Sequence, residues 1–382
     1  MMPNQDFLRR LPESDRALRK RDRLQQRLHL DFWLLLLLLT ISAGGLVVLF
    51  SASDQSLGTI KRQGVYFVIA FVAMMVVAQV PVHFMRRMAP WAYVVGVGLL
   101  LLVVFYGVGA KGAQRWLSIG GFRFQPSEFM KLAMPVAIAA YLGQRHLPPV
   151  FKHIFWTLVL VSIPVVLIIE QPDLGTSILV AASGLMVLFF AGLSWRYIFA
   201  AIGALLLSLW PLWQFVLHDY QKRRVLTLLN PEDDRLGAGW NIIQSKTAIG
   251  SGGVPGKGWL QGTQSHLDFL PEGHTDFIIA VLAEEFGLIG VLILLGLYLL
   301  VVLRGLTIAL RAQDSFGRLL GASITLTFFV YVFVNIGMVS GLLPVVGVPL
   351  PLVSQGGTSI VTLMTGFGIL MAIATEPKRV TR

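Results

Sequence analysis

The residues best suited to chemistry begin with a charged pair, Glu128 and Lys131, near the start of an apolar stretch. On a helix, residues three apart share one face. Pro126 and an acid in the first turn are also ordinary helix-start features, so a cap with a local ion pair is one interpretation. We favour a cavity, because ionisable groups inside an apolar span are costly and usually face one. With Arg115 and Gln125 just before it, such a cavity suits a phosphate or pyrophosphate.

Asp276 is the second candidate for chemistry. It follows Thr275 where another apolar helix should begin, so its side chain is a candidate N-cap. Partial shielding from water at a membrane edge would also suit a carboxylate to act as a general base. The spacing supports both interpretations equally. His274 is a further candidate base, but no second histidine stands at ligand spacing, so it does not predict a zinc site.

Two other groups of acids stand close to apolar stretches. Glu170 and Asp173 flank a helix junction, and Asp173 joins the candidate substrate-binding residues. Glu284 and Glu285 lie about two turns beyond Asp276, and their depth indicates paired or cavity-facing acids.

The glycine-rich stretch 250–258 superficially resembles a phosphate-binding loop. Ser251 replaces the first glycine of that motif, and Gly258 follows Lys257 where serine or threonine is needed. We expect a mobile loop here and no nucleotide site.

The composition shows what must position these residues. The 382 residues are 55% apolar and 13% charged, with mean hydropathy +0.72, whereas soluble domains carry roughly 25% charged residues. Cysteine is absent, so disulfides and cysteine metal sites are excluded. The formal charge of +11 is placed as membrane topology requires and does not indicate a nucleic-acid partner. The sequence therefore predicts an all-α polytopic membrane protein.

Apolar runs near 20 residues match the length of a bilayer-spanning helix and predict about ten spans. They cover residues 31–50, 65–80, 91–108, 126–142, 154–169, 175–192, 196–217, 275–302, 318–340 and 355–375.

The charges predict three parts of the chain. Residues 1–30 form a basic cytoplasmic tail, too long and too basic for a signal peptide. Residues 31–375 form the transmembrane domain, and residues 376–382 form a second cytoplasmic tail. Both termini are cytoplasmic, because this orientation leaves more Lys and Arg inside than outside.

The loops differ between the two sides. Residues 83–90, 143–153 and 304–318 look like short cytoplasmic connectors. The long extracytoplasmic loop, 218–274, contains a predicted amphipathic helix at 239–249, with Trp240, Ile243 and Thr247 on one face. The Pro- and Gly-rich stretch 349–359 predicts irregular backbone, which a membrane tolerates only when it is buried or lines a cavity.

Several ordered motifs resemble the SEDS (shape, elongation, division, sporulation) family of bacterial cell-wall proteins, and more closely its rod-shape branch than its division branch. The resemblance covers nearly the whole chain from the first span. It rests on Arg115-Trp116-Leu117, Gln125-Pro126-Ser127-Glu128, Gln171-Pro172-Asp173-Leu174-Gly175-Thr176, residues 237–258, Leu270-Pro271-Glu272-Gly273-His274-Thr275-Asp276-Phe277 and residues 335–359. Gln355 departs from the tyrosine common in the family.

The resemblance implies a peptidoglycan glycosyltransferase of the bacterial inner membrane that polymerises lipid II during cell elongation, with inversion at the sugar. It implies that Asp276 is the essential aspartate and that Arg115, Glu128 and Lys131 line its cavity. It also implies a class B penicillin-binding protein transpeptidase and other proteins of the elongation complex as partners. Gln125, Asp173 and His274 are the remaining expected substrate-binding residues.

Three questions stay open at this stage. A divalent cation (Mg²⁺ or Mn²⁺) would suit a pyrophosphate leaving group, with Glu170, Asp173 and Asp276 as candidate ligands, but no spacing motif selects a site. A lipid II flippase is an alternative function, since ten spans with buried charges and broken helices fit a transporter. A non-catalytic morphogenesis scaffold is the other alternative.

Overall fold

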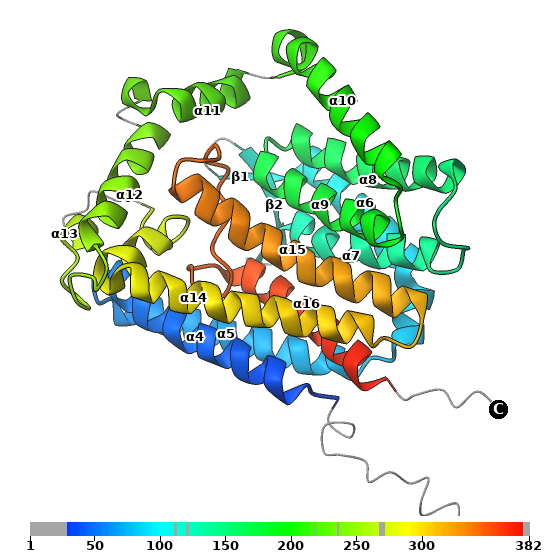
Figure 1. Ribbon diagram of the computed structural model, residues 1–382, viewed down its shortest axis with the longest axis horizontal. Coiled ribbons are helices and arrows are strands. Elements are labelled where there is room, and N and C mark those ends of the chain that lie inside the picture. Colours follow the sequence, from blue (N-terminus) through cyan, green and yellow to red (C-terminus); the bar gives the residue numbers. More distant parts are fainter. Residues whose placement is uncertain are drawn as a thin grey trace, which may run out of the picture.

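The computed structural model describes residues 29–110, 113–119, 122–217, 219–234, 237–266 and 272–376. Long helices dominate these ranges and pack side by side as a bundle (Figure 1). The long helices are α4 (Phe32–Ala52), α5 (Leu57–Ala78), α6 (Val82–Tyr106), α7 (Pro126–Leu142), α8 (Phe151–Glu170), α9 (Leu174–Phe190), α10 (Trp195–Pro211), α14 (Ile278–Leu310), α15 (Ser315–Val339) and α16 (Gly357–Thr375). The shorter elements are β1 (Val108–Ala110), β2 (Ala113–Ile119), β3 (Phe122–Phe124), η1 (Leu212–Val216), α11 (Asp219–Leu229), η2 (Pro231–Asp234), α12 (Ala238–Gly252) and α13 (Thr263–His266).

The ten long helices occupy the positions of the ten predicted spans. Among the described residues, eight are long and apolar enough to cross a membrane: α4, α5, α6, α8, α10, α14, α15 and α16. Helix α9 is apolar but shorter, and α7 carries the Glu128–Lys131 pair within its 17 residues. The predicted polytopic helical architecture is confirmed.

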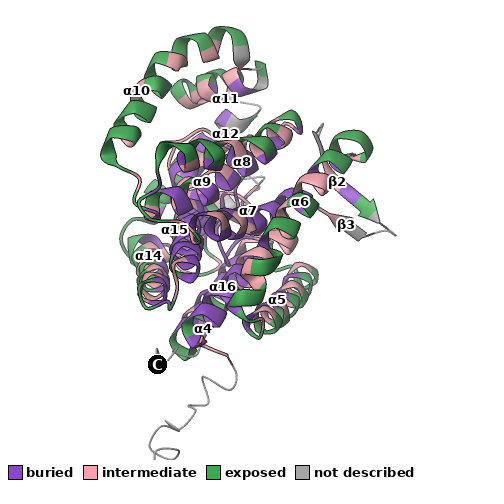
Figure 2. Cartoon of the chain, turned by 90° about the vertical axis from the view of Figure 1, so that its right-hand side faces the viewer, coloured by how far each residue is buried: buried purple, intermediate pink, exposed green. Residues whose placement is uncertain are grey.

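Burial is concentrated on the central helices. Helix α15 packs against α7, α9 and α14, and it is buried along most of its length (Figure 2). Helix α10 has no buried residue among those described and presents apolar side chains such as Leu207 outward. In a membrane protein, such a helix faces lipid. The site candidates on α7 therefore lie at the centre of the bundle.

The two ends of the described chain lie on the same side of the helical bundle. The His29 ring nitrogen is 3.0 Å from Thr375 Oγ1, and Asp31 pairs with Arg304 near the far end of α14. The other end of α4 meets the long loop, where the rings of Phe50 and Trp259 lie 6.1 Å apart. An even number of membrane crossings places both ends of a chain on the same side. That this side is the cytoplasmic one stays a prediction. Residues 1–28 and 377–382 of the predicted tails lie outside the described residues.

Three helices extend further at one end than the sequence predicts. Helix α5 begins at Leu57 because Ser56 caps it, and α6 begins at Val82, so residues 83–90 are helical instead of a connector. Helix α14 continues to Leu310, which makes residues 304–310 helical too. Backbone groups near a membrane need internal partners, so helices extend through polar residues beyond the apolar core.

The loop before α7 contains strands, which the sequence did not predict. Strands β1, β2 and β3 form a small antiparallel sheet in that order. Arg115 lies on β2, and the sheet leads directly into Gln125 at the start of α7.

The long loop is largely helical, and its longest element, α12, covers the predicted amphipathic segment 239–249. The predicted face is wrong, because Ile242, Ser245 and Ala248 are buried while Thr247 is exposed. The buried face packs against α14.

Candidate active site

The first cluster is built on the opening turn of α7. Gln125 occupies the N-cap position and Pro126 the first turn, so the helix starts as its sequence predicts. The Lys131 ammonium donates to Glu128 Oε1 at 2.7 Å, and both side chains are 5% exposed. Ser359 from α16 donates to the same oxygen at 3.2 Å. The predicted pair is therefore formed and buried, with Glu128 Oε2 lacking a hydrogen-bond partner among the described residues.

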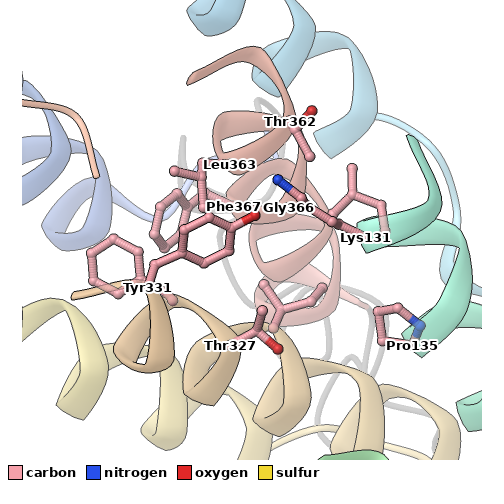
Figure 3. Close-up of a pocket in the computed structure, with 11 residues that line it drawn as sticks. Lys131, Pro135, Thr327, Tyr331, Thr362, Leu363, Gly366 and Phe367 are labelled. Carbon is pink, nitrogen blue, oxygen red and sulfur yellow. The ribbon is translucent and has the colours of Figure 1, made fainter. Parts of the chain in front are cut away.

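Lys131 also faces a small cavity between α7, α15 and α16 (Figure 3). Its ammonium lies 5.2 Å from the centre of the Tyr331 ring, and Thr327 and Thr362 line the same space. The cavity measures about 30 Å³, which accommodates water but not a sugar or a pyrophosphate. In this conformation, the Lys131 ammonium is bound to Glu128, and it can contact substrate only if this ion pair breaks.

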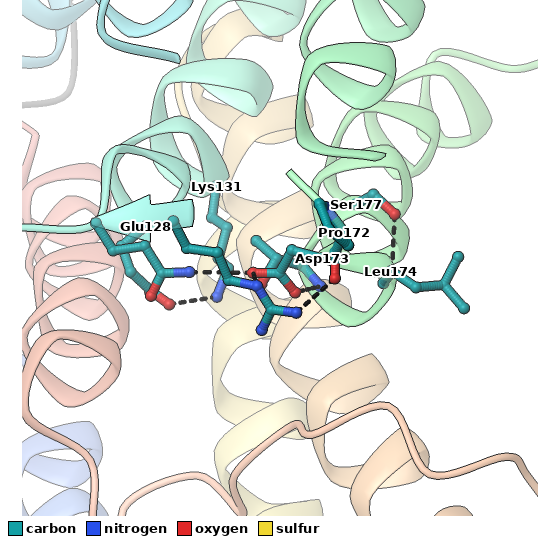
Figure 4. Close-up of polar contacts among 9 residues, drawn as sticks. Glu128, Lys131, Pro172, Asp173, Leu174 and Ser177 are labelled. Carbon is teal, nitrogen blue, oxygen red and sulfur yellow. Dashed lines mark hydrogen bonds and ion pairs between the residues drawn. The ribbon is translucent and has the colours of Figure 1, made fainter. Parts of the chain in front are cut away.

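The second cluster lies where β2 meets the start of α9 (Figure 4). Asp173 caps α9 by accepting from Thr176 N at 3.3 Å, and it accepts from the Gln125 amide at 3.1 Å. Arg115 donates to the Pro172 carbonyl, and its Nε lies 3.8 Å from Asp173 Oδ2.

The structure thus brings Arg115, Gln125 and Asp173 together, as expected for one binding region. The Arg115 side chain is 31% exposed, against 5% for Lys131. Arg115 is therefore the cation that an anionic ligand can reach without rearrangement.

Asp276 lies in a turn directly before α14. The amides of Thr275 and Phe277 both donate to the Glu272 carbonyl, at 3.1 and 3.2 Å. The N-cap position falls on Phe277, which has no side-chain cap hydrogen bond. Asp276 consequently lies one residue before the N-cap and is partly exposed, so the prediction that it occupies the N-cap position is wrong.

Side chains from distant elements hold this turn by its carbonyl groups. The Asn335 amide donates to the Asp276 carbonyl at 2.8 Å and to the Val348 carbonyl at 2.7 Å. Ser354 Oγ donates to the Thr275 carbonyl at 2.5 Å, and Gln355 N donates to the His274 carbonyl at 3.0 Å. These bonds position the backbone of Asp276 through its own carbonyl group and those of its two preceding neighbours. The sequence analysis did not select Asn335 or Ser354 as site residues. Asn335 could have been found, because a polar residue inside an apolar span is itself a signal.

The irregular chain between α15 and α16, residues 344–356, links the two clusters and the Asp276 turn. A Cβ built on Gly347, whose φ is +75°, would lie 3.5 Å from Asp276 Oδ2. A Cβ on Gly175 in the first turn of α9 would lie 2.5 Å from the Val346 carbonyl oxygen. Ser359, which bonds Glu128, follows two residues into α16.

This irregular chain is buried in protein, as its sequence predicts. Val346, Val348 and Leu350 are at most 8% exposed. Gln63 of α5 donates to the Ser354 carbonyl at 3.1 Å, and Tyr298 of α14 donates to the Pro351 carbonyl at 2.7 Å. The unusual backbone is therefore satisfied from several helices and can hold a fixed shape.

The described residues do not offer a preformed metal site. No group of three or more histidine or acidic residues is assembled among them, so Glu170, Asp173 and Asp276 do not form a joint cage.

Comparisons with known proteins agree with this architecture. A family model described as "Cell cycle protein" and covering FtsW, RodA and SpoVE matches residues 28–379. The peptidoglycan glycosyltransferase MrdB of Escherichia coli K12 is 53% identical over 356 residues, covering 93% of this chain and 96% of MrdB. A probable peptidoglycan glycosyltransferase FtsW of Geobacter metallireducens is 38% identical, covering 91% of this chain and 95% of FtsW.

Two solved structures share the fold. A chain from a peptidoglycan synthase complex, described as coordinating polymerization and crosslinking, aligns with a TM-score of 0.80 at 30% identity, covering 90% of this chain and 97% of that one. The rod shape determining protein RodA of Thermus thermophilus aligns with a TM-score of 0.68 at 28% identity, covering 90% and 96%. The family match over nearly the whole length, with these relatives, shows that the chain belongs to the FtsW, RodA and SpoVE family of cell cycle proteins.

Proposed function

We propose that this chain is a multi-pass inner-membrane glycosyltransferase that polymerises lipid II into peptidoglycan strands during elongation, with Asp276 as general base. The carrying observation is the geometry of the Asp276 turn, whose backbone is fixed by Asn335 and Ser354 while Asp276 itself is partly exposed. The relatives MrdB and FtsW, both named peptidoglycan glycosyltransferases, support the reaction class.

The reaction joins a sugar hydroxyl to an anomeric carbon. The 4-hydroxyl of the acceptor's GlcNAc attacks the anomeric carbon of the donor's MurNAc, and the bond to the lipid pyrophosphate breaks with its electron pair. Asp276 accepts the hydroxyl proton as the new bond forms, from within about 3 Å in the reactive complex. One displacement converts an α-linked donor into a β-linked product, so the configuration inverts.

The leaving pyrophosphate needs a nearby positive charge. Arg115 is the exposed cation of the site, and its planar guanidinium suits phosphate oxygens. Lys131 is the second candidate, reached when the Glu128 pair opens. Gln125 and Asp173 orient Arg115, and His274 lines the turn beside Asp276. The membrane contributes too, because two lipid-anchored substrates already share a plane and lose less entropy on meeting.

A divalent cation fits this scheme as a companion of the substrate. Mg²⁺ is commonly held by one or two carboxylates together with substrate phosphates. Bound in that way, the cation would neutralise charge on the leaving group. Addition of a chelator to purified protein tests this: polymerisation should stop and should recover with Mg²⁺ or Mn²⁺. Unchanged rates after chelation would remove the cation from the proposal.

The partner that we propose is a class B penicillin-binding protein transpeptidase, together with other proteins of the elongation complex. The structural similarity to a chain of a synthase complex that couples polymerization and crosslinking supports this choice. The lipid-facing sides of α14 and α15 are suitable for a partner's transmembrane helix, because Leu299 of α14 and Phe329 and Phe333 of α15 are exposed.

The decisive experiment supplies lipid II to the purified, detergent-solubilised chain, alone and with the transpeptidase, and measures glycan polymer. Polymer formation is expected. A pure lipid II flippase would make none in detergent, and a scaffold would bind its partner without polymer under any of these conditions. Absence of polymer with a correctly folded chain and bound partner would overturn the proposed function.

A further inference from the structure

Helix α14 is broken at Gly287, and residues of the long loop form hydrogen bonds with backbone groups on both sides of the break. Gly287 has φ +63°, and a Cβ there would lie 2.3 Å from Gly256 N. Only glycine fits this approach without strain. The helix is therefore two pieces, a short buried piece at residues 278–286 and a longer piece at residues 288–310.

We use the name clasp for residues 253–264 of the long loop, which lie against the break. Lys257 N donates to the Glu284 carbonyl at 3.0 Å, and Gly258 N donates to the Glu285 carbonyl at 2.9 Å. Across the break, Leu288 N donates to the Gly253 carbonyl at 3.0 Å. The clasp thus satisfies groups that an unbroken helix would have paired internally.

A buried charge secures the clasp. The Glu284 side chain is 0% exposed, and its Oε1 accepts from Lys257 Nζ at 2.7 Å. The same oxygen accepts from Thr263 Oγ1 at 3.1 Å and from Gln264 N at 3.0 Å. A buried carboxylate is tolerable only with such partners, so this network ties the middle and the C-terminal end of the clasp to one side chain.

The network also explains the glycine-rich stretch 250–258. Its Lys257 amide and ammonium are both used inside the protein, and a Cβ on Gly256 would lie 2.2 Å from the Glu285 carbonyl oxygen. The prediction of a mobile loop is therefore wrong, because contacts inside the protein hold this stretch in place.

The short piece of α14 connects the clasp to the Asp276 turn. Residues 278–285 are all buried, so the piece moves as a rigid unit. Glu284 lies eight residues beyond Asp276, about 12 Å along a helix at 1.5 Å per residue. We propose that Glu284 and Lys257 are positioning residues, which fix the position of Asp276 through the short piece of α14. This proposal rests on the proposed function.

The test is kinetic and uses the full chain. Glu284→Gln and Lys257→Met should each lower kcat for lipid II polymerisation about 10- to 100-fold, because a misplacement near 1 Å has that effect. KM for lipid II should change less than twofold, and Lys257→Arg should restore most of kcat. Thr263→Val, which keeps both charges, serves as the mild variant should the others fold poorly, with a loss of several-fold.

The Asp31–Arg304 pair at the other end of α14 is the matched control. Its side chains are similarly buried, 9% and 30% exposed against 0% and 26% for Glu284 and Lys257. Arg304→Met should lower thermal stability as much as Lys257→Met does while leaving kcat per folded molecule unchanged. Equal kcat losses at both ends, or none at Glu284, would overturn the positioning role.

Hydrogen exchange separates this proposal from the proposed function. The amides of residues 272–277 should exchange faster in Glu284→Gln than in wild type and Arg304→Met. This readout needs no polymerisation, so it stands even if the wild type makes no polymer. Unchanged exchange in this turn would reject the positioning role on its own.

Discussion

The two parts of the site are positioned in different ways. Glu128 and Lys131 stand on the first two turns of a regular helix, where their spacing brings them together at 2.7 Å. Asp276 stands on an irregular turn held by Asn335 and Ser354, which lie 59 and 79 residues from the residues they bond. The helix holds a buried ion pair, while the turn carries Asp276 as a partly exposed residue. Local geometry is thus enough to form an ion pair within one helix, whereas distant parts of the chain are needed to hold the turn that carries Asp276.

The largest effect should come from the turn. Asp276→Asn should lower polymerisation about 10²- to 10⁴-fold, the range for loss of a general base, because the amide cannot accept the hydroxyl proton. Single-turnover polymerisation of lipid II measures the change. Glu272→Gln is the control in the same turn, where the side chain accepts from Thr275 at 2.7 Å, and it should cost no more than a few-fold. Comparable losses in both variants would contradict the assignment of the base.

The second effect separates pairing from catalysis on α7. Lys131→Met should destabilise the fold by about 3–5 kcal/mol, because it leaves Glu128 buried without its counter-charge. The double variant Lys131→Met with Glu128→Gln should recover most of that stability but remain about 10²-fold slow, since a cation near the leaving group is still missing. Thermal unfolding and polymerisation rates measure the two quantities. Normal turnover in the double variant would show that the pair is structural.

The third effect sharpens the role of tertiary support. Asn335→Ala removes donors to the Asp276 and Val348 carbonyls. Leaving buried carbonyls unpaired should cost about 2 kcal/mol of stability, and kcat should fall about tenfold as the turn loosens. Asn335→Asp, with one oxygen in place of the donating amide, should behave like Asn335→Ala. Steady-state kinetics at saturating lipid II decide the point, and a change confined to KM would contradict it.

The smallest effect concerns Arg115. Arg115→Lys keeps the charge but loses the planar set of donors that contacts Pro172 and Asp173. We expect KM for lipid II to rise a few-fold with kcat nearly unchanged, because this side chain is partly exposed and solvent can replace some contacts. Initial rates across a lipid II series test this. A fall in kcat as large as that of Asp276→Asn would show that the chemical step needs the planar guanidinium of Arg115 and not only its positive charge.

Much of this protein was predictable from local patterns. Apolar runs gave the ten helices, and Pro126 with Glu128 gave the start of α7 and its ion pair. The predictions were wrong where tertiary contacts override the local pattern of apolar residues. The buried face of α12 turned toward α14, and helices α5, α6 and α14 extended past their apolar cores.

The sequence by itself determined which segments span the membrane and which charged residues share a helical face, because hydrophobic and helical periodicity are local properties. Only the tertiary structure decided that Asp276 lies outside the cap of α14 and that residues 253–264 clasp the break at Gly287. Those features depend on hydrogen bonds between residues far apart in the chain. Such bonds form only after the helices pack, so no local spacing encodes them.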